Sequence, residues 1–391
     1  MIFDAAFFDQ GIDRRNTACE KWDDREVMAE GGIPMWVADM DFPCAPAIMD
    51  AIRKRAEHAC FGYSLSDPKN DEALMSFWQR RHSLKIEKKE IEMLPCVVTG
   101  LKACVRAFTN PGDSVAIFTP VYGPFYASIE LNHRKAVPVS LVREEPSGRY
   151  RMNLEALEDA LKNGARLIML CSPHNPVSRL WTGEELTQVC RLAGQYGVPV
   201  VCDEIHADFV FGPGAFVSIL SIPEGERQAV MLCSASKTFN IAGLQQAACV
   251  CKNEEMLEKI RKEIRACGVT SGNIFAMTAT QAAYTACDEW LDGLIGYLDG
   301  SRQLMKDLTE QYLPKAKMTP VEATYLAWLD MRAYGKTCDE MGKMCKEGGV
   351  ALTSGTFFGP EGEGFMRVNF ACPRAMLTEG MRRLGRIFEE E

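Results

Sequence analysis

The sequence of 391 residues lacks the features of several large protein classes. It has no dense basic run, and 44 Lys and Arg against 53 Asp and Glu leave a net charge of −9. An acidic chain of this kind is a poor binder of nucleic acids and of anionic membranes. No internal repeat, heptad array or low-complexity block is present. With 47% hydrophobic and 25% charged residues, the composition is that of a globular protein rather than a disordered one.

The sequence also lacks the patterns of common metal sites, redox motifs and membrane segments. None of its 16 cysteines forms a Cys-x-x-Cys pair or stands with histidine at zinc-ligand spacing, so no metal site is predicted. The longest uncharged stretch, residues 266–287, carries four threonines and is too polar for a membrane span. Three aspartates precede the first basic residue, Arg14, which is unlike a secretory signal. We therefore expect free thiols in a reducing cytoplasm.

Short apolar runs alternate with longer helical patterns through the middle of the chain. We predict strands at residues 114–118, 136–141, 167–171, 198–202, 230–233 and 247–251. Between them, helices are predicted over residues 153–161 and 183–195, the second announced by Thr182 and Glu185 at capping-box spacing. This alternation is typical of an α/β fold with a mostly parallel sheet between helices.

The two ends of the chain have a different pattern. A helix is predicted from Pro46, and the segment before it is irregular and rich in aromatic residues. The C-terminal part is predicted to form, in order, a helix around 288–312, a strand at 324–329, a helix near 338–347, a strand at 366–370 and an amphipathic helix through Leu377, Met381, Leu384 and Phe388. We therefore expect a large α/β domain over 45–290 and a smaller α+β domain formed by 1–44 and 291–391.

Polar side chains follow three of the predicted strands. Asn175 lies shortly after one strand, Asp203 directly after the next, and Lys237 shortly after a third. Each signal alone is weak, since Asp and Asn often cap helices and a lone Lys is usually a solvated charge. Because ligands of open parallel sheets bind beyond the carboxyl ends of the strands, we expect the three side chains to converge on one crevice.

These residue types together indicate a particular chemistry. A lysine flanked by Ser and Thr at a strand end is suited to forming a Schiff base with a carbonyl cofactor. An aspartate can keep a heteroaromatic nitrogen of that cofactor protonated, so that the ring accepts electrons. The loop at 98–103 opens a helix, and the free N–H groups there favour an anion such as phosphate.

Six motifs, spread over nearly the whole chain, carry a resemblance to a known family. They are residues 36–42 (WVADMDF), 119–125 (TPVYGPF), 175–176 (NP), 203–206 (DEIH), 234–244 (SASKTFNIAGL) and 366–374 (MRVNFACPR). In these the chain resembles the MalY/PatB group of cystathionine β-lyases, within the class I/II aminotransferase superfamily of fold-type I pyridoxal-phosphate (PLP) enzymes. The resemblance implies a mostly parallel seven-stranded sheet between helices, PLP as the cofactor, and a homodimer with shared active sites.

The resemblance also implies roles around the ring of the cofactor. Lys237 would bind PLP covalently and move the Cα proton of the substrate, and Asp203 would pair with the pyridine nitrogen. Asn175 and His206 would lie at the phenolic oxygen, and Tyr122 would stack on the ring. Without the motifs, Tyr122 would be a core aromatic and His206 a satisfied buried histidine.

Further residues are implied at the phosphate and at the substrate. Ser234 and the backbone of Thr99, Gly100 and Leu101 would hold the phosphate, together with Tyr63 of the partner subunit. At the substrate, Arg367 would clamp the α-carboxylate in a bidentate fork, and Tyr122 and residues 36–42, Ala38 among them, would line the entrance. Tyr63 could instead be an interface aromatic, and Arg367 an ordinary ion-pair partner.

The chain departs from the family pattern at two positions. Ser178 stands where the family usually has a glycine, which often serves a backbone with positive φ. Gln245 stands where many aminotransferases carry a phosphate-binding arginine. The phosphate cradle would therefore rely on neutral donors and on backbone N–H groups.

The predicted function is that of a PLP-dependent carbon–sulfur β-lyase, acting on L-cystathionine, L-cysteine or S-substituted cysteines to give thiol, pyruvate and ammonia. Tyr122 or Tyr63 would protonate the sulfur. An aminotransferase would use the same residues, and a PLP-fold binding protein without catalysis is a further alternative. A nicotinamide-dependent dehydrogenase is disfavoured, because no Gly-x-Gly-x-x-Gly follows a predicted strand. The expected partner molecules are a small amino acid and a second copy of the chain, without nucleic acid or membrane.

Overall fold

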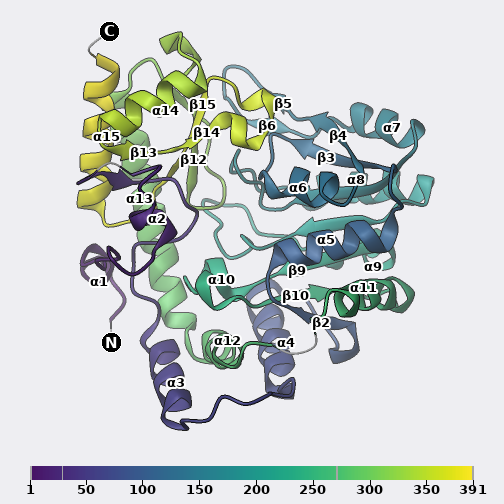
Figure 1. The fold of residues 1–391 in the computed structure, drawn as a ribbon. Coiled ribbons are helices and arrows are strands. Elements are labelled where there is room, and N and C mark those ends of the chain that lie inside the picture. Colours follow the sequence, from purple (N-terminus) through teal and green to yellow (C-terminus); the bar gives the residue numbers. More distant parts are fainter. Residues whose placement is uncertain (1, 29, 270–271, 390–391) are drawn as a thin grey trace.

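A computed structural model describes residues 2–28, 30–269 and 272–389, and a seven-stranded sheet lies at its centre (Figure 1). In spatial order the strands are β2 (Ile91–Leu94), β10 (Ala247–Val250), β9 (Ala229–Cys233), β8 (Val200–Asp203), β7 (Ala165–Cys171), β3 (Ser114–Thr119) and β4 (Lys135–Ser140). β10 is antiparallel to both of its neighbours, and the other pairs are parallel. The predicted fold class, a mostly parallel seven-stranded sheet in an α/β fold, is confirmed.

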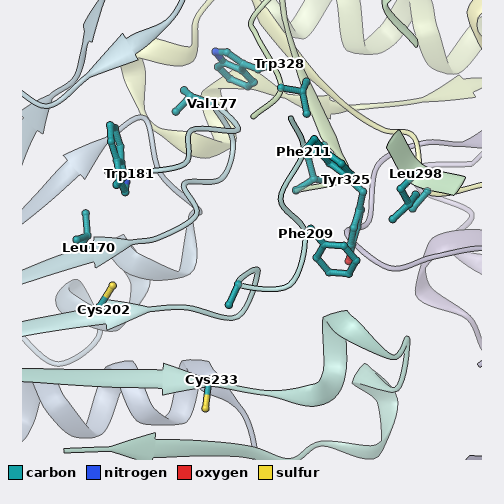
Figure 2. Close-up of a cluster of buried hydrophobic side chains, with 14 of the residues drawn as sticks. Leu170, Val177, Trp181, Cys202, Phe209, Phe211, Cys233, Leu298, Tyr325 and Trp328 are labelled. Carbon is teal, nitrogen blue, oxygen red and sulfur yellow. The ribbon is translucent and has the colours of Figure 1, made fainter. Parts of the chain in front are cut away.

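Both faces of the large sheet are covered by helices. One face packs against α5 (Val97–Phe108), α6 (Pro124–Glu130) and α11 (Glu254–Ala266). The other packs against α7 (Leu154–Lys162) and α8 (Gly183–Tyr196). Alternate residues of each central strand enter the two cores, and Figure 2 shows Leu170, Cys202 and Cys233 doing so from neighbouring strands. Strands buried on both faces have continuous apolar runs, and this explains why the sequence pattern predicted them.

The six strands predicted in the middle of the chain and the two predicted near its C-terminal end are present, and their ends differ from the prediction by at most a few residues. β2 was not predicted, because this short edge strand includes the half-buried Glu92 and has no continuous apolar run. The predicted capping box also forms: the Thr182 hydroxyl accepts from the Glu185 N–H, and the Glu185 carboxylate accepts from the Thr182 N–H.

Other helices flank the sheet or follow it. They are α3 (Pro46–Glu57), α4 (Pro68–His82), α9 (Pro223–Gln228), α10 (Ala235–Thr238) and α12 (Ile274–Ala286). α12 packs against α3 and α4 in the lower part of Figure 1. The helix that was predicted around 288–312 is α13 (Asp288–Tyr312), and its 25 residues run beside a smaller sheet that is formed by the C-terminal part of the chain.

A smaller antiparallel sheet is formed by β11 (Lys317–Met318), β12 (Leu326–Asp330), β15 (Phe365–Asn369) and β14 (Thr353–Ser354). It packs with α13, α14 (Cys338–Glu347) and α15 (Arg374–Glu389).

The N-terminal arm reaches this C-terminal part of the chain. It carries α1 (Ala5–Asp9) and α2 (Glu20–Asp23), and β1 (Ile33–Pro34) then pairs in parallel with β13 (Val350–Ala351). In Figure 1 the purple N-terminal segments accordingly lie beside the yellow C-terminal helix. The division at residues 45 and 290 into two domains stays a prediction.

Within the described ranges, no helix has both the length and the apolar character needed to cross a membrane.

Candidate active site

The three side chains expected in one crevice come together at the carboxyl ends of β7, β8 and β9. These strands are parallel neighbours in register, with Cys171 beside Asp203 and Asp203 beside Leu232. The charges of Asp203 and Lys237 lie close enough to act on each other's pKa. Asn175 is linked to the same place by a 3.1 Å hydrogen bond from Arg367. The expected convergence of amide, carboxylate and amine is therefore present.

Lys237 lies on α10, a single helical turn that begins after Ser234. Its Nζ donates a 2.6 Å hydrogen bond to the backbone carbonyl of Ala38, which brings the 36–42 segment to the amine. Burial lowers the pKa of Lys237 to about 8, against the opposing influence of the Asp39 and Asp203 carboxylates. At neutral pH a useful fraction of the amine is therefore unprotonated.

Asp203 is 5% exposed at the end of β8. One carboxylate oxygen accepts a 3.1 Å hydrogen bond from the Ile205 N–H. Burial raises the pKa of Asp203 to about 7, although that N–H and the Lys237 charge oppose the rise. A protonated ring nitrogen placed beside this carboxylate would keep it ionised.

His206 is buried next to the same crevice. Its Nδ1 has no hydrogen-bond partner among the residues that the structure describes. Burial lowers the pKa of His206 to about 3, so the imidazole is neutral at physiological pH. Its ring meets that of Tyr325 edge-on, with 6.0 Å between the centroids. This nitrogen is available to a ligand, and the role of His206 at the cofactor stays a prediction.

Arg367 enters the crevice from β15 and is 3% exposed. Its guanidinium donates to Asn175 Oδ1 (3.1 Å), to the Trp36 carbonyl (2.6 Å) and to Thr353 Oγ1 (3.1 Å), and lies 4.9 Å above the Phe358 ring. Burial lowers its pKa to about 10.

The guanidinium of Arg367 differs from other buried cations in having no acidic partner. Within the described ranges no carboxylate forms an ion pair with it, and its Nε has no acceptor. The buried Arg179 and Lys21, in contrast, each contact carboxylates. An unpaired buried cation is costly, so this one is suited to receiving the carboxylate of a ligand.

Tyr122 follows β3 and is half-buried at the rim of the crevice. Its ring centroid lies 6.0 Å from that of Phe357. Burial raises the pKa of Tyr122, and the charges of Arg367 and Asp203 act on it with opposite signs. The phenol is thus near both groups and protonated at neutral pH.

The N-terminus of α5 is where the phosphate was expected. Cys96 caps this helix without a side-chain hydrogen bond to it, and the Gly100 N–H donates to the Cys96 carbonyl at 3.3 Å. Gly100 packs closely, because a Cβ there would lie 2.8 Å from the terminal methyl groups of Leu94 and Leu232. Leu101 is in the core, and Thr99 contacts Cys96 Sγ at 3.3 Å. The phosphate role of these residues stays a prediction.

Ser234 and Tyr63 are the two other residues that were predicted to contact the phosphate. Ser234 Oγ donates to the Gln246 carbonyl at 2.6 Å and accepts from the Ser236 N–H, so its hydrogen is already engaged. Tyr63 is fully exposed on the segment between α3 and α4 rather than buried in the crevice of its own chain. Both roles stay predictions.

The turn at Ser178 keeps the conformation for which a glycine would be expected. Ser178 has a φ of +56°, in the left-handed region, and is fully buried. Its hydroxyl donates to the Leu326 carbonyl and contacts Thr324 Oγ1 at 3.2 Å. These bonds hold the serine in a conformation that costs an L-residue about 1–2 kcal/mol.

Several residues that position the site were not predicted individually. Asn240 donates to the Met40 and Phe42 carbonyls, and Asn369 donates to the Val37 and Asp39 carbonyls, the first pair at 2.9 Å each. Tyr325 Oη donates to the Ala38 carbonyl at 2.9 Å. Asn240 and Asn369 lie inside two of the six motifs that carry the family resemblance. Tyr325 lies in an apolar strand pattern, which does not mark it as a residue of the site.

These groups fit PLP. A buried carboxylate facing a lysine suits a protonated pyridine nitrogen, and the unpartnered His206 Nδ1 and the Asn175 amide suit a phenolic oxygen. Lys237 can react with an aldehyde, and the uncapped start of α5 suits an anion.

Comparisons with known proteins identify the family of the chain. The sequence profile of the family Aminotransferase class I and II matches residues 32–384. The cystathionine β-lyase PatB of Bacillus subtilis is 39% identical over 96% of this chain and 98% of its own, and protein MalY of Escherichia coli is 33% identical over 96% of each. The crystal structure of cystalysin from Treponema denticola, which contains PLP, superposes with a TM-score of 0.94 at 29% identity, covering 100% of both chains.

The profile covers most of the chain, and the predicted resemblance and cofactor are confirmed. The chain belongs to the aminotransferase class I and II family of PLP-dependent enzymes, in the group of PatB and MalY.

Proposed function

We propose that the chain is a PLP-dependent carbon–sulfur β-lyase that converts L-cystathionine or S-substituted cysteines to a thiol, pyruvate and ammonia. The observation that carries the proposal is the buried guanidinium of Arg367, which has no ion-pair carboxylate among the described residues and shares a crevice with Lys237 and Asp203. An α-amino acid supplies the missing carboxylate. PLP, when bound, supplies an electron-accepting ring that stabilises negative charge at the substrate Cα.

Arg367 binds and orients the substrate. Its bonds to the Trp36 carbonyl and to Asn175 hold the guanidinium in one plane, so that a carboxylate is received in a defined direction. The Phe358 ring covers one face of the guanidinium and keeps water away from it. Exclusion of water strengthens the interaction with the carboxylate.

Lys237 removes the Cα proton. Because burial brings its pKa to about 8, the free amine is an effective base near neutral pH. The Ala38 carbonyl accepts a hydrogen bond from Nζ and fixes the position of the amine when it is not otherwise engaged. Asp203 would hold the ring nitrogen of PLP, and its carboxylate would keep that nitrogen protonated.

A tyrosine donates the proton that the leaving sulfur requires. Tyr122 lies near Arg367 and Asp203 and is protonated, since burial raises its pKa. Tyr63, from the partner subunit, is the other candidate. General acid assistance of this kind is typically worth about 10²–10⁴ in rate.

The chain works as a homodimer with shared active sites. The segment between α3 and α4 exposes Phe61, Tyr63 and Leu65, the last of them 92% exposed. Such a run of exposed large apolar side chains supports burial against a second copy. A cytoplasmic location is supported by the 16 cysteines, all of which are free thiols.

The test is pyruvate release from L-cystathionine by the PLP-loaded protein without any added keto acid. The wild type releases pyruvate, and the Lys237→Ala variant, measured alongside, does not. Amino transfer that requires 2-oxoglutarate, without pyruvate, would contradict the lyase proposal and identify an aminotransferase.

A further inference from the structure

We propose that Tyr325 is a positioning residue for Lys237, acting through the Ala38 carbonyl that both side chains share. The Ala38 oxygen accepts from Lys237 Nζ at 2.6 Å and from Tyr325 Oη at 2.9 Å. A carbonyl oxygen has two lone pairs, and these two donors use both of them. The inference rests on the proposed function only in taking Lys237 as the reacting amine.

The hydroxyl of Tyr325 is held firmly in place. Tyr325 directly precedes β12 and is fully buried. Its ring packs edge-on against Phe209 at 4.8 Å and against His206 at 6.0 Å, and Figure 2 shows it beside Phe209. Burial also raises the pKa of Tyr325 well above its usual range, so the hydroxyl remains a donor at every pH of interest.

The Ala38 carbonyl is equally constrained. The neighbouring Val37 and Asp39 carbonyls both accept from the Asn369 amide, and the Met40 N–H and carbonyl bond the Asn240 side chain. The peptide group between these bonds cannot turn to favour one donor over the other. Lys237 and Tyr325 therefore compete for one fixed oxygen.

This competition affects the protonation of Lys237. The hydroxyl hydrogen of Tyr325 points at the oxygen that the Lys237 ammonium also binds, which weakens the ammonium–carbonyl bond and favours the neutral amine. The other charged groups that act on Lys237 are Asp39, Asp203 and Glu20, which favour the ammonium, and Arg367, which disfavours it. His206 is neutral. Replacing Tyr325 by phenylalanine leaves all of these groups and the ring packing in place.

The shared carbonyl also defines where the amine lies during turnover. When Lys237 is bonded to another group, the Asn369 and Asn240 bonds keep the Ala38 oxygen in its orientation, and the released amine returns to the same acceptor. Tyr325 Oη donates to that oxygen and thereby affects how often the returned amine is neutral, which is a kcat effect, and it has no part in substrate binding.

The test compares wild type, Tyr325→Phe and a matched control, Tyr150→Phe. Tyr150 is another buried tyrosine whose hydroxyl contacts β12, since it accepts from Trp328 Nε1 at 3.3 Å. The cofactor-free proteins are mixed with PLP at several pH values, the covalent product is trapped with borohydride, and the rate at which Lys237 is labelled is measured by mass spectrometry. Below the pKa of Lys237, we expect Tyr325→Phe to label about tenfold more slowly than wild type, and at high pH equally fast.

Two further measurements complete the test. Thermal unfolding shows whether each variant is folded, and steady-state kinetics should give a lower kcat with an unchanged KM for Tyr325→Phe. Labelling profiles of Tyr325→Phe that superpose on wild type, or a Tyr150→Phe profile that shifts equally, would overturn the inference. If the shift occurs in a protein that releases no pyruvate, the lyase proposal fails and this inference stands.

Discussion

The crevice has two walls that are built in different ways. We call Asn175, Asp203, His206 and Lys237, which follow strands of the large sheet, the sheet wall. Ala38, Tyr325 and Arg367 form the facing wall. On the sheet wall, burial moves the pKa values of Asp203 and Lys237 toward the physiological range and that of His206 below it. On the facing wall, backbone carbonyls and hydroxyls hold a cation and a phenol in place. One wall is thus tuned for proton transfer, and the other for orientation.

The largest expected effect comes from the sheet wall. Asp203→Asn removes the charge that would keep a ring nitrogen protonated, so we expect kcat to fall by about 10²–10³, the usual loss for a preorganised electrostatic group. Steady-state pyruvate assays measure this, with Asp330→Asn as the control. Asp330, the last residue of β12, is also a buried carboxylate, but it pairs with Arg332. An Asp203→Asn enzyme with wild-type kcat would remove the distinction between the two walls.

On the facing wall, Arg367 should respond through binding. Arg367→Lys keeps the charge but loses the planar fork, so a bidentate contact to the substrate carboxylate cannot form. Loss of a buried charged hydrogen bond costs about 2–5 kcal/mol, and we expect most of it as a higher KM. Initial-rate kinetics over a range of substrate concentrations separate the two constants. A fall in kcat at constant KM would instead assign Arg367 to proton transfer.

A carboxylate behind the sheet wall should make its own contribution to the pH dependence of stability. Burial raises the pKa of Glu204 to about 8 from an ordinary 4.5. Between these values the folded protein holds a proton that the unfolded chain has lost, so the free energy of unfolding falls as the pH rises through this range. The slope for one such group is about 1.4 kcal/mol per pH unit as an upper limit. Asp203 contributes in the same direction up to about pH 7.

Glu204→Gln should flatten that slope without changing the fold. Urea unfolding of the cofactor-free variant and wild type at several pH values tests this. Equal slopes in the two proteins would show that Glu204 is already ionised when folded.

The smallest expected effect is at the turn that joins the two walls. Ser178→Gly relieves a left-handed φ worth about 1–2 kcal/mol but loses the hydroxyl bond to Leu326, worth about 1 kcal/mol, so stability should change little. Ser178→Ala loses the bond without relief and should destabilise by about 1 kcal/mol. Thermal unfolding of both variants gives the difference. If Ser178→Gly destabilises the protein, the hydrogen bond from the Ser178 hydroxyl to Leu326 contributes more than the left-handed φ costs.

The sequence allowed the sheet wall to be predicted better than the facing wall. Buried parallel strands have continuous apolar runs, and Asp203 and Lys237 stand out where those runs end. β2 was not predicted, because it is short and Glu92 interrupts its apolar pattern. Asn175, Asp203 and Lys237 were brought together as expected, although their chemical roles remain predictions.

Tyr325 and the Ala38 carbonyl could not be found from the pattern. A tyrosine in a buried strand is usually a packing residue, and a backbone carbonyl leaves no signal in the residue types. Their contact depends on how the 36–42 segment lies against β12 and α10, which is a matter of tertiary structure. Ser178 shows the same limit, because its positive φ is stabilised by a bond to a residue 148 positions away.

The parallel pairing of β1 with β13 has a consequence for biosynthesis. Ile33 leaves the ribosome early, whereas its partner Val350 is translated more than three hundred residues later. The segment that presents the Ala38 carbonyl follows β1 directly and is also bonded by Asn369. Contacts of such long sequence separation form late in folding. A nascent chain can therefore complete its large sheet before Arg367 and Asn369 have been translated, so an incomplete translation product would present Lys237 without the facing wall of the crevice.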